Sequence, residues 1–206
     1  MIRPLPGVMF GAAEDGDARR DDEVKRRLSA ALGVSPDWAW MRQVHGTTVI
    51  RATEPGTLGD ADAAFTTVPG LPLAVGTADC FPVVLTGDGV VGVAHAGWRG
   101  AAEGVVRALR AAMTTAGHPP TSGAIGPGIG SCCFEVGPDV LERFPRSEAI
   151  TSWGTPGVNL RSAILDDMTG LEVWVDGRCT MSDEGFHSYR KTKTTERQVT
   201  VVWIPD

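Results

Sequence analysis

The sequence has few cysteines, few histidines and no long apolar segment, and each shortage excludes a class of protein. None of its apolar runs reaches the roughly 18 to 20 residues that cross a bilayer, and the N-terminal stretch MIRPLPGVMF has too short an apolar region for a secretory signal. With only four cysteines in 206 residues, free thiols or metal ligands are expected rather than a disulfide framework. We therefore expect a cytoplasmic protein with no membrane partner.

Positive charge is also in short supply. The chain has 19 Lys and Arg against 25 Asp and Glu, which gives a formal net charge of -6. This balance argues against nucleic acid or an anionic membrane as the main partner, although a local basic pocket for a small anion is compatible with it. Because 42% of the residues are hydrophobic, we expect residues 1–206 to form a single domain around one sizeable core.

Strand-like and helix-like runs alternate along the chain, without a low-complexity tract or a fixed repeat. The expected class is therefore α/β or α+β. Asp88-Gly89, between two strand-like runs, predicts a hairpin of antiparallel strands, so a purely parallel sheet is not expected. The expected strands cover residues 47–52, 72–77, 82–86, 90–95, 171–175 and 198–204, and the expected helices cover 21–32, 100–116, 138–144 and 158–169.

Three chemically reactive side chains follow strand-like runs. His95 ends such a run in the stretch GVAHAGWRG, whose glycines let the backbone approach a ligand and whose Arg99 stands near the start of the next helix. Cys80 in GTADC and His45 in MRQVHG also follow extended runs. One end of the sheet is thus expected to present two imidazoles and a thiol.

Residue chemistry alone leaves several roles open for this set. Zinc is commonly held by imidazole nitrogen and thiolate, and a catalytic zinc site uses three protein ligands and a fourth, open position. Alternatively, Cys80 is a nucleophile and His95 is its base, oriented by a third group. The separations along the chain match no compact zinc-finger spacing, and a purely structural role for all three residues is the remaining alternative.

Five motifs, in a fixed order along the chain, carry a family resemblance. They are RQVHG (42–46), GTADCFPVVL (76–85), HAGWRG (95–100), IGPGIGSCCFEVG (125–137), and CT followed by FHSYR (179–190). Together they resemble the YfiH/DUF152 family, also called the laccase-domain or polyphenol oxidase family, which includes the peptidoglycan editing factors. The resemblance spans about residues 40 to 204. It implies a four-layer α/β/β/α sandwich with mixed sheets, in which His45, Cys80 and His95 bind one zinc ion per chain, with copper as the other candidate metal.

Members of this family act on purine nucleosides, so the resemblance implies purine nucleosides and phosphate as substrates. They phosphorolyse adenosine, inosine, guanosine or methylthioadenosine and also deaminate adenosine. Deamination needs an activated water that attacks C6 of adenine, whereas phosphorolysis needs a positioned phosphate that attacks C1′ of the ribose. The alternatives are a copper-dependent polyphenol oxidase, a hydrolase that edits cell-wall precursors, and a cell-division interaction module without catalysis. Several coppers would need more histidines than the four present.

Four further residues are candidates for the site. Asp79 is a candidate catalytic residue that orients a ligand or transfers protons, or else it caps a turn. Arg99 is the first candidate for binding phosphate, with a solvated arginine at a helix start as the alternative. Gln43 is expected to hydrogen-bond the purine or its own strand, and Glu135 is expected near the substrate.

The N-terminal loop departs from the family pattern. Family members usually have an arginine and a double glycine there, whereas this chain has GVMFGAAEDGDARRDD, in which Arg19 or Arg20 could supply the missing cation. Because the usual arginine of this loop can contribute to anion binding, its absence would weaken phosphate binding unless another cation replaces it. Adjacent cysteines seldom bridge each other, so we expect Cys132 and Cys133 to be packing residues.

Overall fold

The structure, a computed structural model, describes residues 1–205. Within them, two large sheets and one two-stranded sheet are accompanied by six α-helices. The strands are β1 (Val8–Phe10), β2 (Ala39–Arg42), β3 (Val49–Arg51), β4 (Gly56–Asp60), β5 (Ala63–Thr66), β6 (Leu73–Thr77), β7 (Phe81–Gly87), β8 (Val90–Ala96), β9 (Ser122–Ile125), β10 (Glu148–Ile150), β11 (Pro156–Val158), β12 (Glu172–Val175) and β13 (Gln198–Val202). The helices are α1 (Asp22–Leu32), α2 (Trp98–Glu103), α3 (Val105–Thr115), α4 (Pro138–Leu141), α5 (Leu160–Asp167) and α6 (Tyr189–Thr192), with a short 3₁₀ helix, η1 (Ala13–Asp15).

Both large sheets mix parallel and antiparallel neighbours. The first has the strand order β1-β13-β6-β2-β4 and the second has the order β12-β9-β7-β8-β5-β3. In the first sheet β2 runs parallel to β6 and β4, and in the second β3 runs parallel to β5. The predicted hairpin around Asp88-Gly89 is present, since β7 and β8 pair antiparallel from Phe81↔Ala96 to Gly87↔Val90. The prediction of mixed sheets is confirmed.

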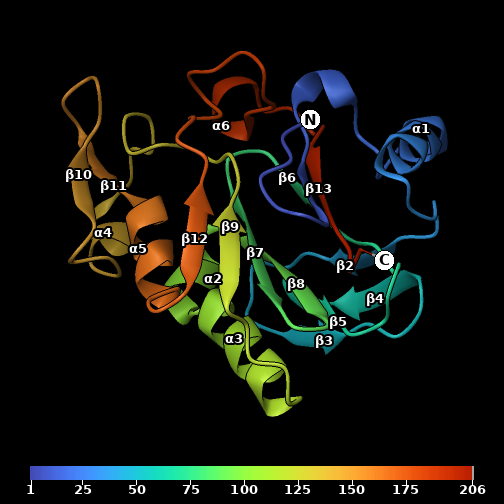
Figure 1. Cartoon of the computed structure of the whole chain (residues 1–206). Coiled ribbons are helices and arrows are strands. Elements are labelled where there is room, and N and C mark those ends of the chain that lie inside the picture. Colours follow the sequence, from blue (N-terminus) through green and yellow to red (C-terminus); the bar gives the residue numbers. More distant parts are fainter. Residues whose placement is uncertain (206) are drawn as a thin grey trace.

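The two large sheets face each other across a buried apolar layer. That layer includes Phe10 and Val75 of the first sheet and Val84 and Val93 of the second. Helix α1 packs against the outer face of the first sheet, and α2, α3 and α5 pack against the outer face of the second (Figure 1). The order of layers is therefore helix, sheet, sheet, helix, as the resemblance implied. None of the helices within residues 1–205 is long and apolar enough to cross a membrane.

The prediction of a single helix over 100–116 is wrong, because the helix is interrupted. The chain forms two helices there, and they meet at Gly104, whose φ of 90° ends α2 and begins α3. Only glycine adopts this left-handed conformation at little cost. Several strands were also not expected, among them β5 and β9, because their sequences AAFT and SGAI are short and poor in β-branched residues.

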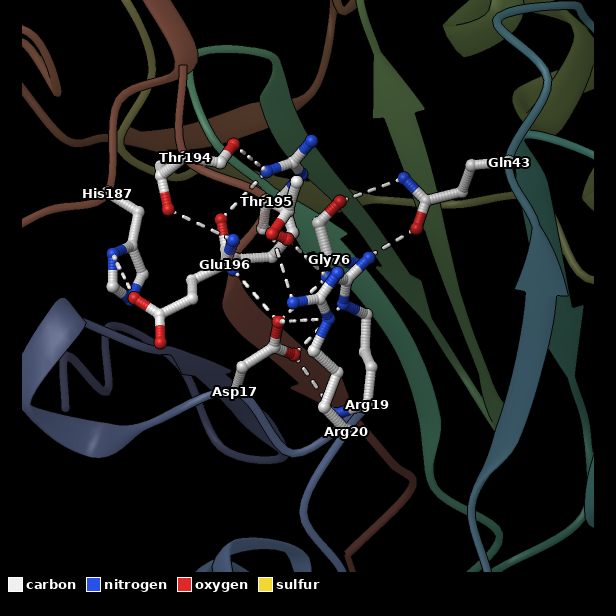
Figure 2. Close-up of polar contacts among 10 residues, drawn as sticks. Asp17, Arg19, Arg20, Gln43, Gly76, His187, Thr194, Thr195 and Glu196 are labelled. Atoms are coloured by element: carbon white, nitrogen blue, oxygen red, sulfur yellow. Dashed lines mark hydrogen bonds and ion pairs between the residues drawn. The ribbon is translucent and has the colours of Figure 1, made fainter. Parts of the chain in front are cut away.

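A buried carboxylate joins the N-terminal loop to the segment before β13 (Figure 2). Asp17 is 8% exposed, and it accepts hydrogen bonds from Nε and NH2 of Arg19 at 3.0 and 2.7 Å and from the backbone N–H of Arg197 at 3.0 Å. Burial opposes ionisation of Asp17, but the hydrogen bonds and the positive charge of Arg19 prevail and lower the pKa of this carboxyl. The two loops are thereby held together at one end of the first sheet.

The helical face that covers the second sheet is expected to account for much of the stability. Leu109 in α3 is fully buried among residues of this core. Replacing it in the variant Leu109→Ala should lower the free energy of unfolding by about 2–5 kcal/mol, because lost apolar burial is combined with a cavity. Denaturant titration measures the change, and Thr115→Ala, at an exposed position of the same helix, should stay within about 0.5 kcal/mol of the parent. Equal effects of the two substitutions would contradict this packing.

The Asp17 contacts predict a dependence of stability on pH. Folding lowers the pKa of Asp17. Its carboxylate therefore stabilises the fold at pH values above the pKa that Asp17 has in the unfolded chain, and this contribution is lost as the pH falls through the lower pKa that Asp17 has in the folded protein. Asp17→Asn should therefore unfold more easily at pH 7, by about 1–3 kcal/mol, and the difference should shrink below about pH 4. Urea titrations across this range test it against Asp37→Asn, at an exposed position. A pH-independent difference would rule out the ionic origin.

Candidate metal centre

The three side chains predicted as metal ligands meet at one end of the second sheet. His45 lies in the loop after β2, Cys80 immediately precedes β7, and His95 is the penultimate residue of β8. Since Pro82 pairs with His95 in the β7–β8 ladder, the thiol and the second imidazole are on neighbouring strands. One ligand atom of each of the three residues lies within 4.8 Å of the other two.

A single buried carboxylate fixes both imidazoles. Asp62 is 0% exposed, and its Oδ1 lies 2.7 Å from Nδ1 of His95. Its two oxygens also accept the backbone N–H groups of Val44, His45 and Gly46 at 3.1, 3.0 and 2.7 Å. These bonds stabilise the turn in which His45 has a φ of 64°, a conformation uncommon for a residue with a side chain. Since a carboxylate only accepts hydrogen bonds, Nδ1 of His95 is the donor and Nε2 is left for a metal.

The backbone beside the centre must be glycine. A Cβ atom at Gly97 would lie 2.9 Å from Cδ2 of His45 and 3.0 Å from Sγ of Cys80. Gly97 therefore explains the small residue in the HAGWRG motif, because any side chain there would displace two of the three candidate ligands.

Charge and burial shift the ionisation of the centre. Burial alone would raise the pKa of the Cys80 thiol, but the positive charge of His95 and hydrogen bonds from both imidazoles lower it to about 6. Burial would likewise lower the pKa of His95, but the Cys80 thiolate and Asp62 raise it to about 9. For Asp62 itself, hydrogen bonds from His95 and Gly46 outweigh burial and lower the pKa. The centre thus favours a thiolate, the form that binds metals and acts as a nucleophile.

The centre opens into a cavity of about 520 Å³ whose wall also carries cations. Arg19, Arg42 and Arg197 all line it. Arg42 forms an ion pair with Asp60 and Arg19 forms one with Asp17. Arg197 reaches Asp17 only through its backbone N–H, and its guanidinium donates to the backbone oxygens of Thr194 and Glu196. Thr77 lines the same cavity, and its Oγ1 is buried without a hydrogen-bond partner among the described residues. The cavity therefore combines the candidate metal ligands with three guanidinium groups and a hydroxyl that has no partner within residues 1–205.

Two of the predicted site residues have other partners. Asp79, whose φ is 88°, accepts a hydrogen bond from Oγ1 of Thr180 at 2.7 Å and one from the backbone N–H of Arg190 at 2.6 Å. Its carboxylate thus accepts a backbone N–H in the first turn of α6, whose N-cap is Ser188. Gln43 lines the cavity, but its side-chain amide bonds the backbone N–H and C=O of Gly76 at 3.0 and 2.9 Å (Figure 2).

Arg99 and Glu135 lie outside the lining of this cavity. The Arg99 guanidinium is 4.3 Å from the ring centroid of Trp98 and the residue is exposed. Oε2 of Glu135 accepts a hydrogen bond from Nε1 of Trp153 at 2.7 Å. The Arg99 guanidinium therefore lies on the ring of Trp98 and not in the wall of the cavity. The position of Arg99 at a helix start did not predict the direction of its side chain.

Other residues of the site were missed or only partly anticipated. Arg19 does line the cavity, whereas NH1 of Arg20 bonds Oγ1 of Thr195. Asp62 had a sequence signal that could have identified it, because it is the one charge in the apolar run ADAAF. Tyr189 and Arg197 line the cavity without such a signal, since their loops approach the centre only in the folded chain.

Comparison with known proteins is consistent with this arrangement. Residues 9–205 match the family model described as multi-copper polyphenol oxidoreductase laccase. The chain is 37% identical over 216 residues to a purine nucleoside phosphorylase of Deinococcus radiodurans, covering 98% of this chain and 84% of the relative. It is 33% identical over 219 residues to the purine nucleoside phosphorylase YfiH of Escherichia coli, covering 98% and 88%.

A solved structure shares the fold. The crystal structure of YlmD from Geobacillus stearothermophilus superposes with a TM-score of 0.84 at 27% identity, covering 100% of this chain and 94% of that one. The match to the family model over nearly the whole chain, together with the relatives and the shared fold, identifies the chain as a member of the laccase-like YfiH/DUF152 family.

Proposed function

We propose that this protein is a zinc-dependent purine nucleoside phosphorylase that also deaminates adenosine. The observation that carries the proposal is the convergence of His45, Cys80 and His95 at a cavity lined by three arginines. The names of the relatives support nucleosides and phosphate as substrates. The nucleosides that we propose are adenosine, inosine, guanosine and methylthioadenosine.

The donor set fits zinc. Two imidazole nitrogens and one thiolate are common zinc ligands, and a catalytic zinc keeps a fourth position open. Asp62 bonds the far nitrogen of His95, as outer carboxylates do for many zinc-bound histidines. A nucleophile with a single base would use Cys80 and His95 but would not require His45, whose turn Asp62 also holds in place. The third converging ligand therefore favours a metal over the nucleophile.

The residues around the cavity supply the remaining parts of the reaction. A zinc ion would contribute Lewis acidity, which activates water for deamination and polarises the purine nucleoside. Arg19 and Arg197 both line the cavity. The Arg19 guanidinium pairs with Asp17, whereas the Arg197 guanidinium donates only to backbone oxygens, those of Thr194 and Glu196, and so keeps a positive charge without a carboxylate partner among these contacts. The surplus charge suits phosphate, which these arginines would hold for attack on C1′. Oγ1 of Thr77 is free to bond a ribose hydroxyl or a phosphate oxygen.

The same geometry disfavours oxidation by several coppers. His118 lies beside the backbone oxygen of Asp88 at 3.3 Å, and His187 lies 3.8 Å from Glu196. Only two of the four histidines are therefore at the candidate centre. A site for several coppers needs more imidazoles gathered together, and a single N₂S centre beside an anion-binding wall suits nucleoside chemistry better.

One assay tests the proposal directly. Metal-quantified protein is incubated with adenosine and inosine, with and without phosphate, and the products are separated by chromatography. We expect about one zinc at the His45–Cys80–His95 centre, ribose 1-phosphate and free base only when phosphate is present, and inosine from adenosine in its absence. Cys80→Ser should lose that zinc and most of both activities, because it removes the ligand that ionises to a thiolate. Full zinc retention in Cys80→Ser and in His95→Ala, or oxidation of phenols in place of nucleoside turnover, would overturn the proposal.

A substitution at Arg197 should impair phosphorolysis but not adenosine deamination. Since this side chain lines the cavity and deamination uses water, Arg197→Met should raise the phosphate KM by about 10- to 100-fold, the loss expected for a charged hydrogen bond. Adenosine deamination should stay within about twofold. Arg99→Ala, which removes an exposed cation outside the cavity lining, is the matched control and should leave the phosphate KM unchanged. Equal loss of both reactions in folded Arg197→Met would assign this arginine a structural role.

A further inference from the structure

A second cluster of metal-ligating side chains lies away from the cavity. The sulfur atoms of Cys132, Cys133 and Cys179 are all within 4.8 Å of one another, and the first two are 3.1 Å apart. The cysteines come from two segments far apart in the sequence, which Gly128 and Cys179 join through an isolated parallel bridge. The expectation that Cys132 and Cys133 only pack is therefore incomplete, because folding brings a third thiol to them.

The spacing of the sulfurs suits one metal ion. A tetrahedral zinc with Zn–S bonds of about 2.3 Å places its sulfur ligands about 3.8 Å apart. The sulfurs of Cys132 and Cys133 are closer than this, at 3.1 Å, and the sulfur of Cys179 lies no more than 4.8 Å from either of them. Small changes in side-chain torsion angles would therefore bring the three sulfurs to ligand positions. Cys132 is half-buried, whereas Cys133 and Cys179 are buried, so a fourth ligand such as water has access from the side of Cys132.

The backbone at the cluster is shaped for sulfur. The N–H of Gly130 points at Sγ of Cys179 at a distance of 3.1 Å, and such a bond stabilises a thiolate. A Cβ atom at Gly130 would lie 3.1 Å from Cβ of Cys179 and 3.3 Å from Sγ of Cys132. Glycine at this position thus lets both cysteines approach the same point.

A neighbouring cation balances the charge of the cluster. Arg161 lies close enough to Asp176, Cys179 and Cys132 for their charges to act on it. Asp176 is already paired with Arg178, and Nε of Arg161 is buried without a hydrogen-bond partner among the described residues. Three thiolates around a divalent ion carry one net negative charge, which the guanidinium of Arg161 would neutralise. Arg161 is half-buried and its guanidinium otherwise donates to the backbone oxygen of Arg178, so a negatively charged cluster would give it a charged partner that three neutral thiols would not.

We propose that Cys132, Cys133 and Cys179 form a second zinc site, separate from the nucleoside centre. The ion would connect the loop after β9, which carries Cys132 and Cys133, to the loop after β12, which carries Cys179. The connection to that centre is short, because Thr180, next to Cys179, donates its hydroxyl to Asp79, next to Cys80. The role of the second ion is structural: it fixes the loops against which the Asp79–Cys80 turn is held.

Cadmium serves as the probe, since it is thiophilic and its thiolate complexes absorb in the near ultraviolet. The full chain is kept under a phosphine reductant, freed of metal and titrated with Cd²⁺, while absorbance and bound metal are measured. We expect two ions per chain in the parent and one in Cys80→Ser, with the absorbance of three thiolates remaining in that variant. Cys132→Ser should bind one ion and lose at least tenfold in affinity for the second, because it removes one of three ligands. Zinc should compete for both sites.

Several controls keep the result interpretable. Ser131→Ala changes a neighbouring side chain that offers no sulfur, so it should bind two ions like the parent. Cys132 is half-buried, so Cys132→Ser should fold, which circular dichroism checks, and Cys179→Ser provides a second variant. Cys132→Ser should also retain a metal at the first centre and its nucleoside turnover, which separates failure of this proposal from failure of the proposed function. A single cadmium in the reduced parent, or a second cadmium bound by Cys132→Ser with the affinity of the parent, would overturn the second site.

Discussion

The carboxylate of Asp62 is the interaction on which the candidate centre depends. It is inaccessible to solvent and accepts four hydrogen bonds, three from the backbone turn of His45 and one from the ring of His95. An ionised carboxylate in such a place is costly unless its oxygens are satisfied. The same bonds that satisfy Asp62 therefore orient the ring of His95 and hold the backbone turn that carries His45. Loss of this buried charge would disturb the geometry of the centre.

The turn around His45 needs the hydrogen bonds that its backbone donates to Asp62. A non-glycine residue at a φ of 64° carries conformational strain that the surrounding structure has to offset. Three N–H groups that converge on one carboxylate do so, and Gly97 leaves the space into which the His45 ring turns. The position of His45 thus depends on Asp62, 17 positions further along the chain. It also depends on Gly97, which has no side chain to occupy the space of the His45 ring.

The sequence predicted the parts of this molecule that local patterns encode. The β-branched runs of β6, β7, β8 and β13 have the composition and the boundaries expected of buried strands. They predicted a mixed α/β class, and the four layers followed only from the family resemblance. The three candidate ligands were identified because imidazole and thiol are scarce in this chain and follow those runs. Short strands such as β9 had no comparable signal, since glycine and alanine have little preference for extended structure.

The residues that give the cavity its charge were harder to predict, because their positions depend on contacts between distant segments. Arg99 is the second residue of α2, at a helix start, yet its guanidinium lies on Trp98. Arg197 has an unremarkable local sequence, yet its backbone bonds Asp17, 180 positions earlier. A helix start indicates where an anion is favoured but does not determine where a long, flexible side chain points. The positively charged wall of the cavity is therefore a product of loop packing around Asp17, and it is formed by segments with a weak sequence signal.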